Sequence, residues 1–160
     1  MTGFRGAVIT ISDSAARRAR DDTSGDAIVA WLTGLEVDVT MRTTIPDDSE
    51  AIAAVLLTAI PETEVIVTTG GTGLGPRDFT PQAVSPLLDY EVPGMAEVMR
   101  SIGLQSTPRA MLSRQLVGVR DRTLILVLPG STRAVEESLS AVGQALPHAL
   151  ELLRSTTHQH

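Results

Sequence analysis

The feature that most constrains the fold is a set of short apolar runs, rich in β-branched residues, spread along the chain. Four runs have the length and composition of strands: residues 5–12 (RGAVITIS), 36–45 (EVDVTMRTTI), 64–69 (EVIVTT) and 123–128 (TLILVL). The run at 123–128 is apolar almost throughout, which is typical of a parallel strand covered on both faces. A further strand is expected at 116–120, joined to it through Asp121-Arg122.

The segments between these runs predict helices. They lie at residues 23–34, at 48–60 and from Thr80-Pro81 onward. A helix in pieces is expected across 92–113, with breaks at Gly103 and Pro108. A final helix ends at about residue 153 and is kinked or split at Pro147. Thr23 and Asp26 resemble a capping box for the first helix. A loop is expected at 13–22, and Met95, Met99 and Met111 are expected to be core or packing residues rather than a cofactor box. Strands that alternate with helices predict an α/β fold with a mostly parallel sheet.

Length and composition narrow the class of protein. The 160 residues fit one domain, 1–160, with a core at about 5–153 and a frayed tail at 156–160. Cysteine is lacking, which excludes disulfide scaffolds and thiolate zinc sites. No apolar run has the length of a membrane span and the first residues do not resemble a signal peptide, so we expect a cytoplasmic protein without a membrane partner.

The charge of the chain restricts its partners. A net charge of -6 argues against general binding of nucleic acid. All 13 basic residues are arginine, so a phosphate-binding lysine is excluded. An anionic substrate would have to be held by local arginines, backbone amides or a metal ion.

Unusual residues follow four of the predicted strands. These are Ser12-Asp13, Pro46-Asp47-Asp48, the glycine loop Gly70-Gly71-Thr72-Gly73, and Pro129-Gly130-Ser131. Ligands of open parallel sheets bind beyond the carboxyl ends of the strands, and parallel strands end at the same edge. The sequence therefore predicts a ligand site where these four segments meet.

The glycine loop is suited to binding phosphate, because glycine tolerates positive φ and lets backbone amides turn toward an anion. Two standard motifs fail, however. Pro76-Arg77 stands where a P-loop needs lysine and serine or threonine, and Pro76 also replaces the third glycine of a dinucleotide fingerprint. Spacing alone leaves a ligand loop and a plain turn equally open, and the position at a strand end favours the ligand loop.

Asp47 and Asp78 follow different strands and are the candidates for a metal site. Two carboxylates of this kind hold a hard cation that neutralises phosphates during phosphoryl or nucleotidyl transfer. Taken alone, Asp47 would be interpreted as a helix N-cap and Asp78 as a solvated turn residue. The three histidines are dispersed along the chain and do not suggest a metal site, and Ser12 and Ser131 have no histidine nearby in sequence for a catalytic triad.

These segments together resemble the Mog/MoaB family of molybdopterin-handling proteins. Seven stretches match in the family's order: 9–13 (ITISD), 45–48 (IPDD), 68–73 (TTGGTG), 77–81 (RDFTP), 92–95 (VPGM), 111–114 (MLSR) and 128–131 (LPGS). The combination is specific, although Gly-Gly-Thr-Gly alone would be weak.

The resemblance implies a three-layer α/β/α fold that assembles as a trimer or hexamer. It implies that ATP adenylylates the phosphate of molybdopterin and that pyrophosphate leaves, with Mg²⁺ as the cofactor. Asp47 and Asp78 would then be the catalytic and metal-binding pair. Residues that would contact the pterin phosphate or the nucleotide are Gly70, Gly71, Thr72, Gly73, Pro129, Gly130 and Ser131, and residues that would line the site are Ser12, Asp13 and Ser113.

Two further interpretations stay open. The chain is short and little sequence separates its final strand from its last helix, which resembles the MoaB branch and makes a non-catalytic molybdopterin-binding or scaffold protein the alternative. The resemblance also implies contacts with other molybdenum cofactor synthesis proteins. A general nucleotide-binding α/β domain is disfavoured by the two failed motifs. Retention of Asp47 and Asp78 favours the enzyme.

Overall fold

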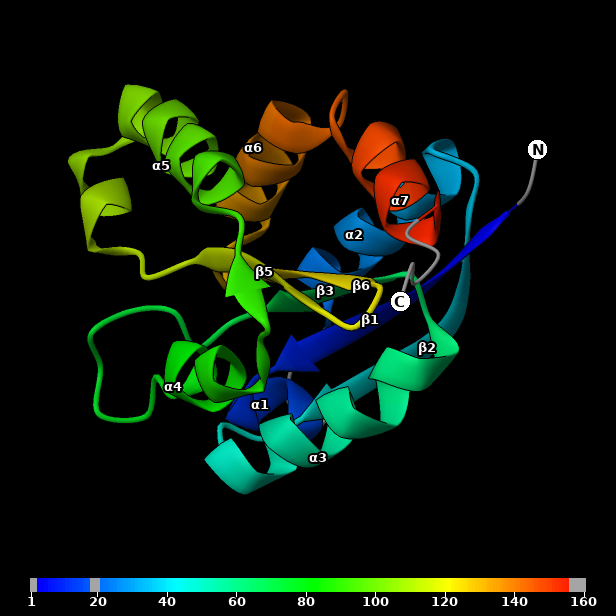
Figure 1. The fold of residues 1–160 in the computed structure, drawn as a ribbon. Helices are drawn as coiled ribbons and strands as arrows, with labels where there is room; N and C mark the ends of the chain where they lie inside the picture. The colour runs from blue at the N-terminus through cyan, green and yellow to red at the C-terminus, as the bar shows by residue number, and fades with distance from the viewer. Residues whose placement is uncertain (1–2, 18–20, 156–160) are drawn as a thin grey trace.

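The computed structural model describes residues 3–17 and 21–155. Its centre is a six-stranded sheet in the order β2-β1-β3-β6-β5-β4 (Figure 1). The strands are β1 (Phe4–Ile11), β2 (Val37–Ile45), β3 (Val65–Thr69), β4 (Tyr90–Glu91), β5 (Leu116–Arg120) and β6 (Thr123–Leu128). β1, β2, β3 and β6 are parallel, whereas β5 and β4 run antiparallel. The mostly parallel sheet is confirmed. The tail expected at 156–160 lies outside the described residues.

The helices follow the strands in the expected alternation. They are α1 (Asp13–Ala16), α2 (Thr23–Gly34), α3 (Ser49–Ala59), α4 (Thr80–Val84), α5 (Pro93–Ser106), α6 (Thr132–Val142) and α7 (Leu146–Ser155), with 3-10 turns η1 (Ile60–Glu62), η2 (Ser85–Leu87) and η3 (Pro108–Leu112). The last helix is split just before Pro147, which occupies the second position of α7. None of the helices in the described residues is long and apolar enough to span a membrane.

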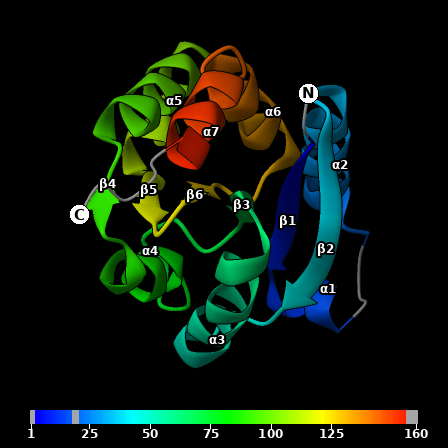
Figure 2. The same ribbon diagram turned by 45° about the vertical axis from the view of Figure 1, so that its right-hand side comes forward.

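Helices cover both faces of the sheet, which makes three layers (Figures 1 and 2). Side chains of successive strand residues point to opposite faces. In β1, Val8 belongs to the core under α2, α5, α6 and α7, and its neighbour Ile9 belongs to the core under α3 and α4. The same division separates Leu126 from Ile125 in β6. The unbroken apolar runs in the sequence therefore report strands that are buried on both sides.

Some expectations about local structure are wrong. The loop at 13–22 begins with a helical turn, α1, because the Ser12 hydroxyl accepts a hydrogen bond from the Ala15 amide and caps it. The cap of α2 is Asp22 rather than Thr23, and its carboxylate accepts from the Gly25 amide. Both differences arise because a polar side chain one position away satisfies the free amides of the first turn.

Two differences concern the segment after α4. Helix α5 continues through Gly103, where the missing side chain lets Ala110 of η3 pack closely; a Cβ at this position would be 2.9 Å from the Ala110 Cβ. Met99 is buried and Met95 packs against the core, but Met111 is 64% exposed on η3. Tertiary packing rather than local propensity decides both cases.

The two edges of the sheet differ in length. β2 is a nine-residue edge strand that carries the exposed charged residues Asp38 and Arg42, and Arg42 forms ion pairs with Asp22 and Asp26 at the start of α2. The opposite edge strand, β4, has two residues and pairs with Val119 and Gly118 of β5. The β5–β6 hairpin turns at Asp121, whose φ of 55° is in the left-handed region that aspartate tolerates.

Candidate active site

The carboxyl ends of the four parallel strands lie at one edge of the sheet. In the register, Ile11 of β1 is opposite Ile45 of β2, and Thr69 of β3 is opposite Leu128 of β6. β1 and β3 are themselves paired up to Thr10 and Thr69. The four segments predicted to meet are therefore brought together, each beginning within two residues of the end of its strand.

The glycine loop requires glycine at its first two positions. Gly70 and Gly71 have φ values of 105° and 73°. A Cβ on Gly70 would be 2.1 Å from the Ile11 carbonyl oxygen, and a Cβ on Gly71 would be 2.2 Å from the Thr80 hydroxyl. The chain turns here through a conformation that only glycine adopts easily, next to the end of β1.

Side chains from outside the loop hold it in place. The Thr80 hydroxyl donates to the Gly70 carbonyl at 2.8 Å, and the Thr80 amide donates to the Gly71 carbonyl at 3.1 Å. The Arg114 guanidinium donates to the Gly73 carbonyl at 2.7 and 3.0 Å and to the Asp78 carbonyl at 2.9 Å. The loop is thus fixed at both ends, and its carbonyl groups are satisfied by these donors.

Asp13 and Asp47 join the ends of β1 and β2 through reciprocal hydrogen bonds. The Asp13 amide donates to the Asp47 carboxylate at 3.2 Å, and the Asp47 amide donates to the Asp13 carboxylate at 3.1 Å. Arg77 adds two bonds to the Asp13 carboxylate, at 2.7 and 3.2 Å, and one to the Asp47 carbonyl at 3.2 Å. The Asp13 carboxylate thereby links Asp47 to Arg77, which lies in the segment after the glycine loop.

The pKa values of Asp13 and Asp47 are shifted in opposite directions. The hydrogen bonds from Arg77, and next the bond from the Asp47 amide, hold the pKa of Asp13 below its ordinary value. Burial raises the pKa of Asp47, and the negative charges of Asp13 and Asp78 add to this rise. Asp47 is therefore the carboxylate that gains most from a nearby cation.

Asp47 and Asp78 both lie against the glycine loop. A Cβ on Gly71 would be 3.3 Å from Asp47 Oδ1, and a Cβ on Gly73 would be 2.8 Å from Asp78 Oδ2. One oxygen of each carboxylate accepts a backbone amide: Asp47 Oδ2 from Asp13, and Asp78 Oδ2 from Gly75 at 2.8 Å. Within the described residues, Oδ1 of each has no hydrogen-bond donor. Asp48, not Asp47, caps α3, so Asp47 has no capping role.

This arrangement fits a hard cation. Mg²⁺ is usually held by one or two carboxylates, with water and substrate phosphates completing its coordination. The two carboxylate oxygens that lack donors among the described residues, beside the glycine loop, match that donor set. Across residues 3–17 and 21–155, no group of three or more metal-ligating side chains comes together. Any bound cation would therefore depend on substrate oxygens.

The remaining predicted residues line two cavities on either side of the loop after β6. A polar cavity of about 170 Å³ is lined by Ser12, Gly70, Gly130 and Ser131 among others. A second cavity of about 320 Å³ is lined by Ser113, Pro129 and Ser131 among others. Ser131 contributes to both, and its hydroxyl also caps α6. The Thr72 and Ser113 hydroxyls are 3.4 Å apart, which connects the second cavity to the glycine loop.

Three contributors could not be assigned from the sequence. Arg114 binds the carbonyls of Gly73 and Asp78. Phe79 occupies the N-cap position of α4, and the Thr80 hydroxyl holds the glycine loop. Arg77 bridges two acidic segments. The signal available was their position within the matched stretches 77–81 and 111–114, since spacing does not reveal a carbonyl partner.

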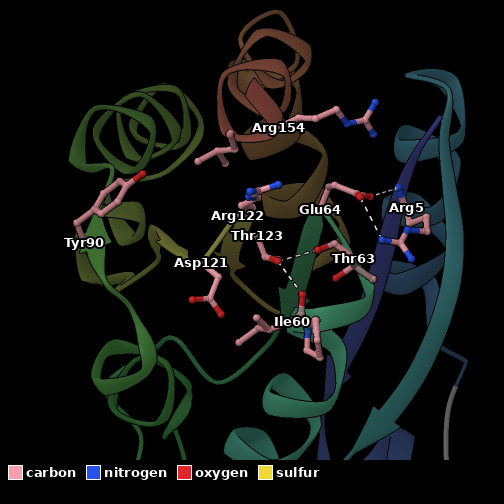
Figure 3. Close-up of a pocket in the computed structure, with 11 residues that line it drawn as sticks. Arg5, Ile60, Thr63, Glu64, Tyr90, Asp121, Arg122, Thr123 and Arg154 are labelled. Atoms are coloured by element: carbon pink, nitrogen blue, oxygen red, sulfur yellow. Dashed lines mark hydrogen bonds and ion pairs between the residues drawn. The ribbon is translucent and has the colours of Figure 1, made fainter. Parts of the chain in front are cut away.

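A wider cavity, of about 640 Å³, lies at the other end of the parallel strands, where β1, β3 and β6 begin (Figure 3). Its polar groups are largely engaged with one another: Thr123 donates to the carbonyls of Ile60 and Thr63, and Arg5 pairs with Glu64. None of the predicted site residues lines it.

Comparison with known proteins places this geometry in a family. A family model described as "probable molybdopterin binding domain" matches residues 7–148. The chain belongs to the molybdopterin-binding domain family. The resemblance inferred from the matched stretches is thereby confirmed.

Relatives of this molybdopterin-binding domain differ in how much of their own length the chain covers. The molybdopterin adenylyltransferase of Escherichia coli is 38% identical over 149 residues, which cover 91% of this chain and 76% of that protein. The molybdenum cofactor biosynthesis bifunctional protein of Synechococcus elongatus is 37% identical over 159 residues, 99% of this chain but 50% of that protein. The chain thus spans half the length of the latter relative.

A solved relative confirms the α/β fold. The molybdopterin biosynthesis enzyme MoaB of Thermus thermophilus is 49% identical, with a TM-score of 0.86 over 94% of this chain and 96% of that one. The three-layer arrangement of this domain is therefore the arrangement of its solved relative.

Proposed function

We propose that this domain transfers the adenylyl group of ATP to the phosphate of molybdopterin. A phosphate oxygen of molybdopterin attacks the α-phosphorus of ATP, the bond from that phosphorus to the bridging oxygen breaks, and pyrophosphate leaves. The observation that carries the proposal is the pair Asp47 and Asp78 against the glycine loop, where each has one oxygen held by a backbone amide and one without a donor among the described residues. The relative from Escherichia coli named molybdopterin adenylyltransferase supports the same activity.

The residues of the site have different roles in the proposed reaction. The Gly70 amide donates to the Leu128 carbonyl, so the amides of Gly71, Thr72 and Gly73, in a loop fixed by Thr80 and Arg114, bind and orient phosphate oxygens. Asp47 and Asp78 would hold Mg²⁺, which supplies neutralisation of the phosphate charge when bound. Asp13 and Arg77 keep Asp47 in position. The acceleration then comes mainly from positioning and electrostatics.

The test is adenylyl transfer by the purified chain with molybdopterin, ATP and Mg²⁺. Asp78→Asn should keep molybdopterin binding and lose about 10²–10³ in rate, the typical effect of removing one preorganised charged group. Asp38→Asn, an exposed aspartate on β2, is the matched control and should transfer normally. Excess chelator should also stop transfer while the protein stays folded. Full transfer by Asp78→Asn or in chelator would refute the proposed roles of the carboxylates.

Binding of molybdopterin without transfer is the second candidate. It is favoured by the family model, whose description names molybdopterin binding and no reaction. Under this candidate the wild-type chain binds molybdopterin but forms no adenylylated product. The same assay therefore separates the two functions.

We also propose a trimer or hexamer in the cytoplasm, where ATP is available, with contacts to other molybdenum cofactor synthesis proteins. Exposed apolar side chains on α5 and η3, which are Val98, Leu104, Met111 and Leu112, support association through this region. Light scattering at micromolar concentration tests it, and a monomer there would contradict the trimer.

A further inference from the structure

Arg77 is a cationic side chain that reaches the ends of β1 and β2 from the segment after the glycine loop. Its Nε and Nη2 donate to the Asp13 carboxylate at 2.7 and 3.2 Å, and Nη2 also donates to the Asp47 carbonyl at 3.2 Å. Nη1 has no acceptor within residues 3–17 and 21–155. One edge of the guanidinium is therefore held by the protein, and the other edge keeps donors for a ligand.

The side chain of Arg77 is also open to solvent. It is 63% exposed, although it takes part in three hydrogen bonds. An exposed ion pair contributes little to stability, because both groups are well hydrated when they are apart. The pair with Asp13 therefore stabilises the fold only slightly, whereas the exposed guanidinium is accessible to a soluble anion.

The charge of the site makes this cation important for an anionic substrate. The negative charges of Asp13 and Asp78 act on Asp47, and the positive charge of Arg77 opposes them. The chain has no lysine, and the Arg114 guanidinium is directed at backbone carbonyls. A polyphosphate bound here is repelled by the three carboxylates. Arg77 is a charged donor positioned to offset that repulsion.

The position of Arg77 indicates which part of a nucleotide it meets. Arg77 contacts the segments after β1 and β2, which form one side of the sheet order β2-β1-β3-β6. The cavities of about 170 and 320 Å³ lie beside the loop after β6, and Arg77 is not among the described residues that line them. In phosphoryl and nucleotidyl transfer the attacking and leaving oxygens lie on opposite sides of the phosphorus. With the organic parts of both substrates in these cavities, the leaving group extends toward Arg77.

We propose that Arg77 is a catalytic residue that binds the β- and γ-phosphates of ATP and then the pyrophosphate that leaves. The inference rests on the proposed function. As the phosphate oxygen of molybdopterin bonds to the α-phosphorus, the bond from that phosphorus to the bridging oxygen breaks, and its electron pair stays on pyrophosphate. Arg77 remains protonated and donates through Nη1 to this growing negative charge, so no proton is transferred. Charge-assisted hydrogen bonds of this kind are stronger than neutral ones.

A role confined to positioning Asp13 makes a different prediction. If Arg77 only holds Asp13 in place, removing either partner of the pair has the same effect. If Arg77 binds polyphosphate, the two partners act in opposite directions. Loss of the Arg77 charge weakens the binding of an anion, whereas loss of the Asp13 charge removes a repulsion and frees the guanidinium. Arg77→Gln and Asp13→Asn therefore separate the two roles.

The test measures the binding of pyrophosphate to the purified chain by titration calorimetry in the presence of Mg²⁺. Arg77→Gln should weaken this binding about 10- to 100-fold, the effect of removing a charge-assisted hydrogen bond. Arg77→Lys should restore part of it, because lysine keeps the charge without the planar fork. Asp13→Asn should bind pyrophosphate at least as tightly as the wild type does. Arg5→Gln is the matched control, since it breaks an exposed pair with Glu64 at the other end of β1 and should bind normally.

Nucleotide binding and transfer rates complete the design. ATP affinity should fall in Arg77→Gln by a factor similar to that for pyrophosphate, whereas AMP, which lacks the β- and γ-phosphates, should bind as before. The kcat of transfer should fall about 10²–10³-fold, with an unchanged KM for molybdopterin. Circular dichroism checks that every variant is folded.

Three results would overturn the assignment of Arg77. They are unchanged pyrophosphate affinity in folded Arg77→Gln, equal weakening by Arg77→Gln and Asp13→Asn, and no pyrophosphate binding by the wild type. If the wild type forms no adenylylated product yet Arg77→Gln loses pyrophosphate, the adenylyl-transfer proposal fails and the polyphosphate site at Arg77 stands.

Discussion

Gly71→Ala tests whether the glycine loop depends on the contact between Gly71 and Thr80. An alanine there takes a φ of 73°, which costs about 1–2 kcal/mol for a residue with a Cβ. Its Cβ would also be 2.2 Å from the Thr80 hydroxyl, so that side chain must turn and lose its buried bond to the Gly70 carbonyl. A lost bond of this kind costs about 1–3 kcal/mol.

The two costs together lower the free energy of unfolding by about 2–5 kcal/mol. For a domain of this size that corresponds to a drop of roughly 4–20 °C in melting temperature. Calorimetry at fixed protein concentration measures it. Gly34→Ala is the control, because no atom lies within 4 Å of a Cβ at the end of α2 and the change should be neutral or slightly stabilising.

A double-mutant cycle isolates the contact with Thr80. In a Thr80→Ala background the hydroxyl is gone, so Gly71→Ala should cost only the backbone part, about 1–2 kcal/mol. An equal cost of Gly71→Ala in both backgrounds would show that the hydroxyl contact is not responsible. A folded Gly71→Ala variant should also transfer poorly, since its Cβ would lie 3.3 Å from Asp47 Oδ1.

Three further predictions concern single side chains. Burial raises the pKa of Asp47, so the contribution of this carboxyl to the free energy of unfolding is present at acidic pH and is lost as the pH rises through the folded-state pKa. The metal-free Asp47→Asn variant should therefore be more stable than the wild type at neutral pH but not in acid. Urea unfolding at several pH values measures this difference. Arg114→Gln should reduce the transfer rate at least about tenfold, because the Gly73 and Asp78 carbonyls lose their donor, and added guanidinium should partly rescue it. An unchanged transfer rate would contradict the positioning role of Arg114. Thr68→Val should stabilise the fold by about 1 kcal/mol, since the buried Thr68 hydroxyl has no partner among the described residues. Thr69→Val should destabilise the fold, because it removes the hydrogen bond to the Pro129 carbonyl. The opposite order of urea midpoints would refute both expectations.

The arrangement of the sheet follows closely from the sequence. The run 123–128 is buried at every residue and apolar from 124 to 128, because both faces of β6 are covered. The hydrophobic pattern does not contain information on packing at single positions, however. Gly103 was interpreted as a helix break, yet its missing side chain makes room for η3 within a continuous helix. Met111 looks like a core residue by type and lies on the surface.

The site was predictable only at the level of its segments. The ends of parallel strands must meet, so the convergence of Asp47 with the glycine loop follows from the α/β pattern alone. Which atom each side chain contacts does not follow. Arg114 lies 41 residues from Gly73 in the sequence and binds its carbonyl.

The unequal edges of the sheet have a consequence for how copies of the protein avoid uncontrolled aggregation. An exposed edge strand offers unpaired backbone groups that can add a foreign strand. At β4 this template is only two residues long. At β2 it is nine residues long, but Asp38 and Arg42 interrupt it with charges, and Arg42 is tied to the first turn of α2. Growth of a continuous sheet from molecule to molecule is thereby discouraged at both edge strands.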